Sequence, residues 1–372
     1  MHAGVSLRAG GFATLALAAA CAAAPRAPAR ATPAPAPSPV ALLRAPFDVE
    51  ARRARVGRAL PAPPPTPATP PIRDLAGVSF YVDDAKSVAD PELKAQNLAA
   101  LAPLRDFVAE VTALADGWMV SRPADTRYAE RAGDALAAWA DGGALLGAVN
   151  RQGAYEREWT LGSLALAYLK IREAAGVPAA RHAVIQRWLC AIATAVRPPY
   201  ERMDRDSSSN NHAYWTGLAV AAAGVACQDR GHFDWGLARA RLGLAQVNPD
   251  GLLPLEMARA RLALHYHVFA LAPLVMLAEL GAANGVPLYD EHERALRRLA
   301  DRVIAGLADP TIFERLTGFP QEQLTDPPRK ADLAWAEPYF ARFRDPRLTP
   351  WLTAARPLRD VRLGGDLTAA FE

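Results

Sequence analysis

Ser207-Ser-Ser-Asn-Asn-His-Ala-Tyr-Trp215 is the segment from which the chain is best interpreted. It brings amides, an imidazole and two aromatic rings together just before an Ala/Leu-rich run that continues past Leu218. Ser209 or Asn210 can cap a helix, and the run that follows predicts a helix over 212–229. The polar side chains therefore lie at the mouth of that helix.

Two interpretations of this segment compete. A single histidine at a helix start is usually a core or surface residue, and Tyr214 and Trp215 would then only pack. The concentration of polar and aromatic groups favours a binding site instead, because Trp215 follows His212 by three residues and both can face one cleft. Asn211 and His212 are accordingly the first candidates for an active centre.

Helical periodicity dominates the chain on both sides of this segment. Leu101, Leu104, Val108 and Val111, for example, recur at spacings of three and four and so share one helix face. No segment sustains a period of two, so the fold class is all-α. An ordinary bundle of antiparallel hairpins and a curved toroid of hairpins both satisfy the pattern. Helices are predicted over 93–119, 127–146, 156–174, 182–196, 212–229, 231–246, 256–282, 289–308 and 331–343.

Two local features modify this pattern. Pro273 falls inside the 256–282 helix and is expected to kink it or end it one residue earlier. The C-terminal sequence Arg362-Leu-Gly-Gly-Asp-Leu367 has too much glycine for a helix and is expected to fold back as a loop or strand.

The N-terminus has the layout of an export signal. Residues 1–21 contain Arg8, an apolar run and small residues around Cys21, and Leu17-Ala-Ala-Ala-Cys21 is similar to a bacterial lipobox. Lipidation of Cys21 and plain cleavage both remain open. Residues 22–72 are rich in Ala and Pro and predict an extended, solvated tether, in which 41–59 could form a short helix. The folded domain is then 73–372, exported to the periplasm and expected to be a monomer.

Composition limits the classes of binding partner and cofactor that the chain can be expected to have. The chain has 372 residues, 51% hydrophobic content and a formal net charge of +3, with no Lys/Arg-rich run, so a nucleic-acid partner is not expected. Cys190 and Cys227 remain after the signal, and both a disulfide and two buried thiols are open. Neither the cysteine number nor its spacing suits a zinc site, and no metal or other cofactor is expected.

The motif resembles a known family. Asn210-Asn-His-Ala-Tyr-Trp215 is similar to the Asn-Asn-His-Ser-Tyr-Trp motif of the alginate (polymannuronate) lyases. Further segments resemble the same family in order, from about residue 75 to the end: Trp159-Thr-Leu-Gly-Ser-Leu-Ala165, Phe233-Asp-Trp235, Gln246-Val-Asn-Pro-Asp-Gly-Leu-Leu-Pro254, Asn284-Gly-Val286, Trp335-Ala-Glu-Pro-Tyr339 and Arg362-Leu-Gly-Gly-Asp366. The resemblance implies an incomplete α/α toroid and a cleft for an anionic, uronate-containing polysaccharide.

The resemblance also implies a reaction, β-elimination. The uronate carboxylate is neutralised, a base removes the C5 proton, and an acid protonates the leaving oxygen at C4. The family's Asn and His map onto Asn211 and His212. The family's later Tyr and Arg, aligned without gaps from Leu253-Pro254 to Leu274, map onto Phe269 and Leu262, which can neither transfer a proton nor carry charge.

Helix geometry offers replacements for the missing pair. At about 100° per residue, Tyr266 and His265 flank the direction of Phe269, with Arg259 near Tyr266 and Arg261 near His265. We therefore predict Tyr266 or His265 as the proton-transfer group and Arg259 or Arg261 as the cation. His267 points the opposite way and is predicted to be structural.

Other candidates are weighed alongside these. Tyr214, Trp215, Arg157 and Trp159 are predicted to bind substrate, against plain surface and core roles. The leading function is a polysaccharide lyase; the alternative is a catalytically weakened binder of anionic polysaccharide with the same fold. A glycoside hydrolase would need paired carboxylates beside the aromatic motif, and none is apparent.

Overall fold

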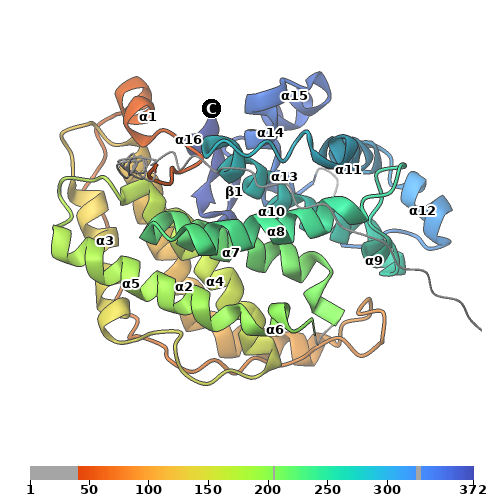
Figure 1. Ribbon diagram of the computed structural model, residues 1–372, viewed down its shortest axis with the longest axis horizontal. Coiled ribbons are helices and arrows are strands. Elements are labelled where there is room, and N and C mark those ends of the chain that lie inside the picture. Colours follow the sequence, from red (N-terminus) through yellow and green to blue (C-terminus); the bar gives the residue numbers. More distant parts are fainter. Residues whose placement is uncertain (1–40, 204–205, 324–327) are drawn as a thin grey trace, which may run out of the picture. The chain divides into compact units, whose positions relative to one another are not determined.

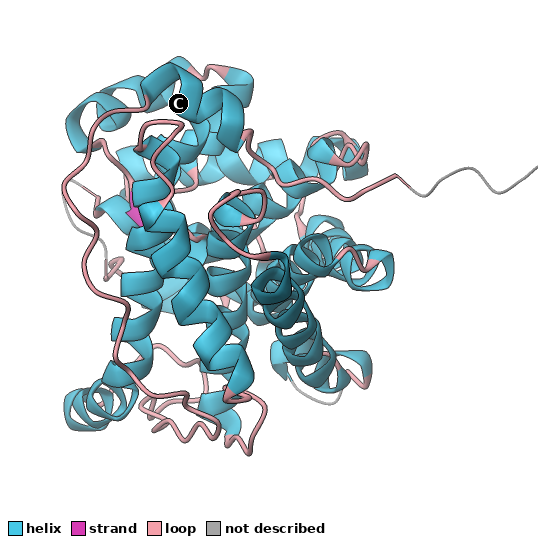
Figure 2. Cartoon of the chain, turned by 90° about the vertical axis from the view of Figure 1, so that its left-hand side faces the viewer, coloured by secondary structure: helices cyan, strands magenta, loops and turns pink. Residues whose placement is uncertain are grey.

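The computed structural model describes residues 41–203, 206–323 and 328–372. The predicted signal, the lipobox with Cys21 and the first part of the predicted tether lie outside these residues. Within them the structure is mostly helical, and Figure 2 shows the helices in cyan with very little strand. The all-α prediction is confirmed.

The longer helices follow the predicted order (Figure 1). They are α1 (Val49–Val56), α2 (Pro91–Val120), α3 (Arg127–Asp141), α4 (Arg151–Ile171), α5 (Ala179–Val196), α7 (Asn211–Cys227), α8 (Arg230–Gln246), α10 (Ala263–Ala283), α11 (Glu291–Ala308), α12 (Thr311–Thr317), α14 (Ala336–Phe343) and α15 (Thr349–Ala355).

Short elements connect and complete them. These are α6 (Pro198–Glu201), η1 (Asp206–Ser208), α9 (Pro254–Met257), η2 (Ala260–Leu262), α13 (Lys330–Leu333), η3 (Pro346–Leu348), β1 (Arg359–Asp360), η4 (Val361–Leu363), β2 (Gly365–Asp366) and α16 (Leu367–Phe371).

The helices form two layers of an incomplete α/α toroid. In the inner layer, α2 packs on α4, α4 on α7 and α7 on α10, while α3, α5, α8 and α11 pack outside them. Figure 1 shows α7 and α8 running side by side. Burial matches these positions, because all residues from Ala213 to Ala226 of the inner helix α7 are buried. A helix that is apolar on every side requires such a place.

Small residues bring α7 and α8 close together. A Cβ atom added to Gly236 of α8 would lie 2.3 Å from the carbonyl oxygen of Gly217 in α7. Glycine is therefore required where the two backbones meet. At the far end of α7, Cys227 forms a disulfide with Cys190 of α5. This settles the question that the sequence left open.

The predicted helix over 256–282 is instead three elements. After α9 the chain passes through Ala260, whose φ of 49° is left-handed, and through η2 before α10 begins. α10 then continues across Pro273 without ending there. Among the described residues, Ala260–Ala283 is the one helical stretch long and apolar enough to cross a membrane, but 83% of its most apolar window is buried in the core. It is the central core helix of the inner layer.

The folded unit begins at Leu42 rather than near Arg73. Residues 49–56 form the short helix that the sequence allowed, and Leu43 is buried. The Pro-rich segment after it is extended but lies against α3, where the indole nitrogen of Trp139 donates to the carbonyl of Thr69 (2.9 Å). Composition did not predict this packing, because the segment is held mainly through its backbone carbonyls.

The C-terminal sequence folds back as predicted. β1 and β2 pair antiparallel, with Asp360 opposite Gly365. The buried ammonium group of Lys170 in α4 donates to the carbonyl of Gly364 (2.7 Å) and pairs with Asp116 of α2. The hairpin that carries Arg362 is thereby fixed to the inner helices.

Candidate active site

The first turn of α7 presents the motif side chains. The Asn210 side chain accepts a hydrogen bond from the His212 N–H (3.0 Å), which is the predicted N-cap. Since this cap fixes where α7 begins, Asn211 and His212 lie at its open end.

Asn211 is anchored by a buried carboxylate. It is fully buried, and its side-chain nitrogen lies 3.0 Å from each carboxylate oxygen of Glu256. Its backbone N–H also donates to Glu256 (2.9 Å). Glu256 is itself fully buried. Burial raises the pKa of Glu256, while the hydrogen bonds from Asn211 and the charge of Arg259 oppose that shift.

His212 lies against two aromatic rings from α4. Its ring centroid is 4.0 Å from that of Tyr155 and 5.8 Å from that of Trp159, with the planes nearly parallel. Burial, followed by the positive charges of Arg259 and Arg151, lowers the pKa of His212 to about 3. The imidazole is therefore uncharged at neutral pH and keeps a free lone pair.

A tyrosine and an arginine from the α9–α10 region complete the polar part of the site. The guanidinium carbon of Arg259 lies 4.8 Å from the ring centroid of Tyr266, and its Nε is 3.7 Å from Glu256. The Tyr266 hydroxyl donates to that of Tyr81 (2.9 Å). Burial, then the neighbouring Tyr81, raises the pKa of Tyr266, so the phenol is protonated at neutral pH.

An aromatic wall runs beside these groups. The Phe269 ring lies 5.0 Å from Trp215 and 6.2 Å from Trp159, measured between centroids. The guanidinium of Arg362 lies over both Trp159 (5.0 Å) and Phe269 (5.8 Å). Leu262, in contrast, is fully buried in the core. Phe269 therefore belongs to the aromatic wall of the site.

His265 lies beside Tyr266, with ring centroids 5.3 Å apart. Its ring is nearly parallel to that of Phe269, with centroids 6.4 Å apart. Burial lowers the pKa of His265 to about 4; Asp332 opposes this shift, and Arg329, Arg362 and Lys94 add to it. This histidine faces a different set of charges from Tyr266.

Buried polar atoms without a hydrogen-bond partner gather here. Most buried polar groups in proteins are paired, so an unpaired cluster marks a place where a polar ligand can bind. Within the described residues the cluster contains Asn211 Oδ1, His212 Nδ1, Arg259 Nε, Trp159 Nε1, Trp215 Nε1 and His265 Nδ1. It offers both donors and an acceptor, as a sugar requires.

Three predicted substrate-binding residues point elsewhere. Tyr214 is fully buried and donates to Gln246 (2.8 Å). Arg157 donates to the carbonyl of Ala195 at the end of α5 (3.4 Å). Arg261 pairs with Glu322 (3.0 Å), because the break before α10 separates its direction from that of the helix. Their predicted roles are not supported.

Four site residues were not predicted from the sequence. Glu256, Tyr155 and Tyr81 give no signal by spacing, because only the fold brings them to α7 and α10. Arg362 belongs to the C-terminal segment that resembles the family, but its aromatic contacts depend on the C-terminal hairpin.

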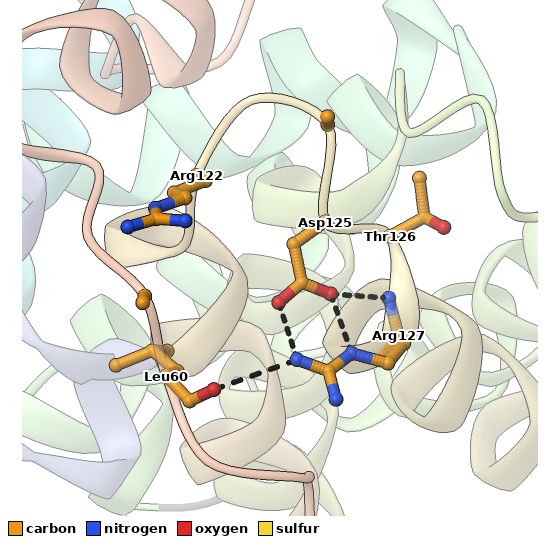
Figure 3. A pocket seen from close by; sticks show the side chains of 7 residues that line it. Leu60, Arg122, Asp125, Thr126 and Arg127 are labelled. Carbon is orange, nitrogen blue, oxygen red and sulfur yellow. Dashed lines mark hydrogen bonds and ion pairs between the residues drawn. The ribbon is translucent and has the colours of Figure 1, made fainter.

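Two other features of the described residues lie apart from this site. A surface hollow of about 410 Å³ lies at the start of α3, where Arg127 pairs with Asp125 and donates to the carbonyl of Leu60 (Figure 3). It contains none of the site residues above. Cys190, Asp229 and His232 also come together as metal-binding types, within the part of the chain that the structure describes. The sulfur of Cys190 is committed to the disulfide, which removes it as a thiolate ligand.

Comparison with known proteins identifies the family of this chain. Residues 76–313 match the alginate lyase family. The chain belongs to the alginate lyase family. It is 41% identical over 314 residues to a polysaccharide lyase of Stenotrophomonas maltophilia (strain K279a), covering 83% of this chain and 90% of that relative. It is 38% identical to an alginate lyase of Pseudomonas fluorescens (strain Pf-5) over 64% of this chain and 65% of that protein.

Solved structures of this family show the same fold. Alginate lyase A1-III from Sphingomonas species A1 matches with a TM-score of 0.75 and 26% identity, over 89% of this chain and 97% of that one. A tyrosine-to-phenylalanine variant of A1-III complexed with a tetrasaccharide gives a TM-score of 0.78 at 26% identity, over 89% and 97%. A histidine-to-alanine variant with a tetrasaccharide gives 0.77 at 27% identity, over 90% and 97%. The toroid prediction is confirmed.

Proposed function

We propose that this member of the alginate lyase family cleaves a uronate-containing polysaccharide of the alginate type by β-elimination. The observation that carries the proposal is the convergence of Asn211 and His212 with Arg259 and Tyr266 around one buried carboxylate, Glu256. The relatives named for alginate support the substrate class.

The geometry supports the following roles. In β-elimination the C5–H and C4–O4 bonds break, a C4–C5 double bond forms, and O4 gains a proton. His212 is uncharged, so its lone pair can accept the C5 proton. Tyr266 is a protonated phenol and can donate to O4. Arg259 lies over the Tyr266 ring, where its charge stabilises the phenolate that this transfer leaves.

We assign the family's tyrosine role to Tyr266 rather than to the position of Phe269. In the two A1-III variants, the altered histidine and tyrosine are separated by 54 positions, and His212 and Tyr266 have that separation (266 − 212). Arg259, which stacks on Tyr266, replaces Leu262 as the cation in this assignment. The gapless alignment from Leu253 placed the family's tyrosine one turn too far along α10, at Phe269.

The non-catalytic alternative rested on Phe269 and Leu262. The family match does not favour it. Phe269 contributes to the aromatic wall instead, in a role that needs no proton. His265, which the sequence predicted as an alternative proton-transfer group, is proposed to bind substrate instead, and its ring lies beside those of Tyr266 and Phe269.

The test is incubation with a panel of alginate, polyglucuronate and hyaluronate-type polymers. An unsaturated product absorbs in the ultraviolet, and we expect that absorbance to grow with wild-type protein and to fall at least about a hundredfold in rate with His212→Ala. No absorbance with any uronate polymer would overturn the proposal. Binding without product would instead support the non-catalytic alternative.

We also propose that the protein is exported, monomeric and lipid-anchored through Cys21. The N-terminal sequence supports export, and a disulfide between Cys190 and Cys227 is consistent with an oxidising compartment. Cell fractionation with labelled fatty acid should place label on wild type and not on Cys21→Ser. Sedimentation of the chain from Leu42 onward should give the mass of one copy; a dimer would overturn the monomer.

A further inference from the structure

Glu256 has no assigned part in the reaction, although it contacts Asn211 three times. We propose that Glu256 is a positioning residue, which turns the amide of Asn211 so that its carbonyl oxygen, and not its NH2 group, meets the substrate. This inference rests on the proposed lyase function and adds to it how the substrate's carboxyl group is bound.

The contacts decide which end of the amide faces which way. Oxygen and nitrogen of an asparagine are assigned from their hydrogen-bond partners. The end of Asn211 that lies 3.0 Å from both oxygens of Glu256 has two acceptors in front of it, so it must be the NH2 group. The backbone N–H of the same residue, 2.9 Å from Glu256, fixes the carboxylate from a second direction.

The charge on Glu256 is stabilised on its other side. Arg259 Nε lies 3.7 Å from the carboxylate and has no hydrogen-bond partner among the described residues. A fully buried carboxylate is costly unless a cation and donors surround it, and here Arg259 and the donors of Asn211 fill both needs. Glu256 therefore connects the two halves of the site, the start of α7 and the segment before α10.

The opposite end of the amide is left without a partner. Asn211 Oδ1 is buried and accepts no hydrogen bond in the described part of the chain. An amide oxygen can only accept, so its ligand must supply an O–H group. A uronate carboxyl group placed against Asn211 Oδ1 is held in its protonated form. An ionised carboxylate would place its own acceptor oxygen against the acceptor Oδ1, and the two would repel.

This changes where the neutralising charge comes from. His212 is uncharged at neutral pH, and the NH2 group of Asn211 is occupied by Glu256. Neither residue supplies a positive charge to the substrate. The carboxyl group is instead neutralised by a proton that it shares with Oδ1, which makes the C5–H bond more acidic without an ion pair.

Kinetics test the positioning role. Glu256→Gln keeps the size of the side chain but places a donor toward Asn211, which turns the amide over. We expect kcat to fall at least about tenfold while KM changes less than about threefold, as for Asn211→Ala. If Glu256 acts through Asn211, the double variant Glu256→Gln/Asn211→Ala should match Asn211→Ala alone. If the losses in kcat of the two single variants multiply in the double variant, the proposal is overturned. It is also overturned if Glu256→Gln keeps the wild-type kcat.

Glu279→Gln is the matched control. Glu279 is also a buried carboxylate, held by Arg342 and by the Tyr289 hydroxyl, and it lies outside the site. We expect this variant to lower the melting temperature and leave kcat unchanged. A loss of kcat as large as that of Glu256→Gln would mean that removing any buried charge has the same effect, and would overturn the positioning role.

A second measurement does not depend on Glu256 variants folding. With 15N-asparagine labelling, the side-chain NH2 signal of Asn211 is identified by its absence in Asn211→Ala. In His212→Ala, which we expect to cleave an oligouronate at least about a hundredfold more slowly than wild type, that signal should keep its position when the oligomer binds. A large shift would show that the NH2 group contacts the ligand, and would overturn the proposal. If no polymer is cleaved, the lyase function fails, whereas this signal still tests the orientation of Asn211.

Discussion

Tyr266 and Phe269 lie one turn apart on α10 and differ by a single hydroxyl group, yet they have different partners. Tyr266 pairs its hydroxyl with Tyr81 beneath the Arg259 guanidinium, whereas Phe269 packs between Trp159 and Trp215. The polar partners define the position where a proton can be transferred. The aromatic partners define a surface on which a sugar ring can stack.

Removing the Tyr266 hydroxyl is therefore expected to abolish turnover and retain binding. We expect Tyr266→Phe to lower kcat by about 10²–10⁴-fold, the usual range for a lost general acid, with polymer affinity within about threefold of wild type. Tyr214→Phe is the control, because it deletes a buried hydroxyl that donates to Gln246 on α8. Product formation by Tyr266→Phe at the wild-type rate would contradict the assignment.

Arg362 is the cation of the aromatic wall. It stacks over Trp159 and Phe269 and forms no ion pair with a carboxylate side chain within the described residues, so its charge remains available to an anionic polymer. We expect Arg362→Met to weaken polymer binding and to reduce its dependence on salt concentration. Arg359→Met, which removes the ion pair between the exposed Arg359 and Asp366 on the same hairpin, should leave both unchanged. Equal effects of the two variants would exclude a specific role for Arg362.

His267 is a structural histidine with a measurable pH signature. Its Nε2 accepts from the Leu253 N–H (2.9 Å), its Nδ1 contacts the Ala263 carbonyl (2.7 Å), and burial lowers its pKa from 6.5 to about 4. Between these values the unfolded chain takes up a proton that the folded chain excludes. The free energy of unfolding is thus fully supported above pH 6.5 and falls as the pH drops towards 4, by up to about 3 kcal/mol.

Thermal unfolding of wild type and His267→Gln tests this sign. The variant should be the less stable protein at pH 7.5, and the difference in melting temperature should shrink by pH 4.5. A difference that stays constant over this range would show that His267 does not contribute through its proton.

At the scale of elements, the disulfide joins α5 to the end of α7. Cys190 and Cys227 are 37 positions apart, and a bond that closes a loop of this size stabilises a fold by about 3–4 kcal/mol in the loop-entropy account. We expect the double change Cys190→Ser/Cys227→Ser to lower the free energy of unfolding by about that amount, measured by denaturant titration. Because the site groups described lie at the opposite end of α7, kcat of the folded variant should be unchanged. An unchanged denaturation midpoint would contradict the prediction.

The elements that the sequence predicts well are the long, uniformly apolar ones. The Ala/Leu pattern placed α7 and α8 within one or two residues of their ends, because the N-caps Asn210 and Asp229 mark where the helices begin. The predicted 256–282 helix failed at its start, where the chain turns through Ala260. An alanine gives no sequence signal for a left-handed backbone, so the break at Ala260 could not be predicted. Because the predicted directions assumed a continuous helix, they were wrong for Arg261. The same assumption of a continuous helix nevertheless placed Arg259 beside Tyr266, as the structure shows.

At the scale of the whole molecule, the site is harder to predict than the fold. A hydrophobic pattern repeats along each helix, so it can be read locally. Glu256, Tyr81 and Arg362 reach the site from three separate segments, and only the packing of the inner helices brings them together. The motif at Asn211 identified one side of the cleft; the other side depended on contacts between residues far apart in sequence.

The N-terminal helix α1 is the clearest case of such long-range packing. Arg53 stacks on Trp118 (3.2 Å to the ring centroid) and donates to the carbonyls of Trp118 (3.0 Å) and Arg122 (2.7 Å) where α2 ends. Its neighbour Arg52 donates to Thr368 in the C-terminal helix (3.4 Å). α1 thus ties the end of the first inner helix to the end of the chain. The segment that contains α1 has the composition of a free tether, yet it packs against both α2 and the C-terminal helix.

Replacing Arg53 should therefore destabilise the whole unit. Arg53→Met keeps the apolar stem but leaves the carbonyls at the end of α2 without their donor, and we expect a loss of about 2–4 kcal/mol in the free energy of unfolding. Arg55→Met is the control, since Arg55 is exposed and donates to the backbone carbonyl of the terminal Glu372. If the two variants unfold at the same denaturant concentration, the Arg53 contacts of α1 do not stabilise the folded unit. A selective loss in Arg53→Met, with kcat unchanged at 25 °C, would show that stability and chemistry are carried by opposite ends of the inner helices.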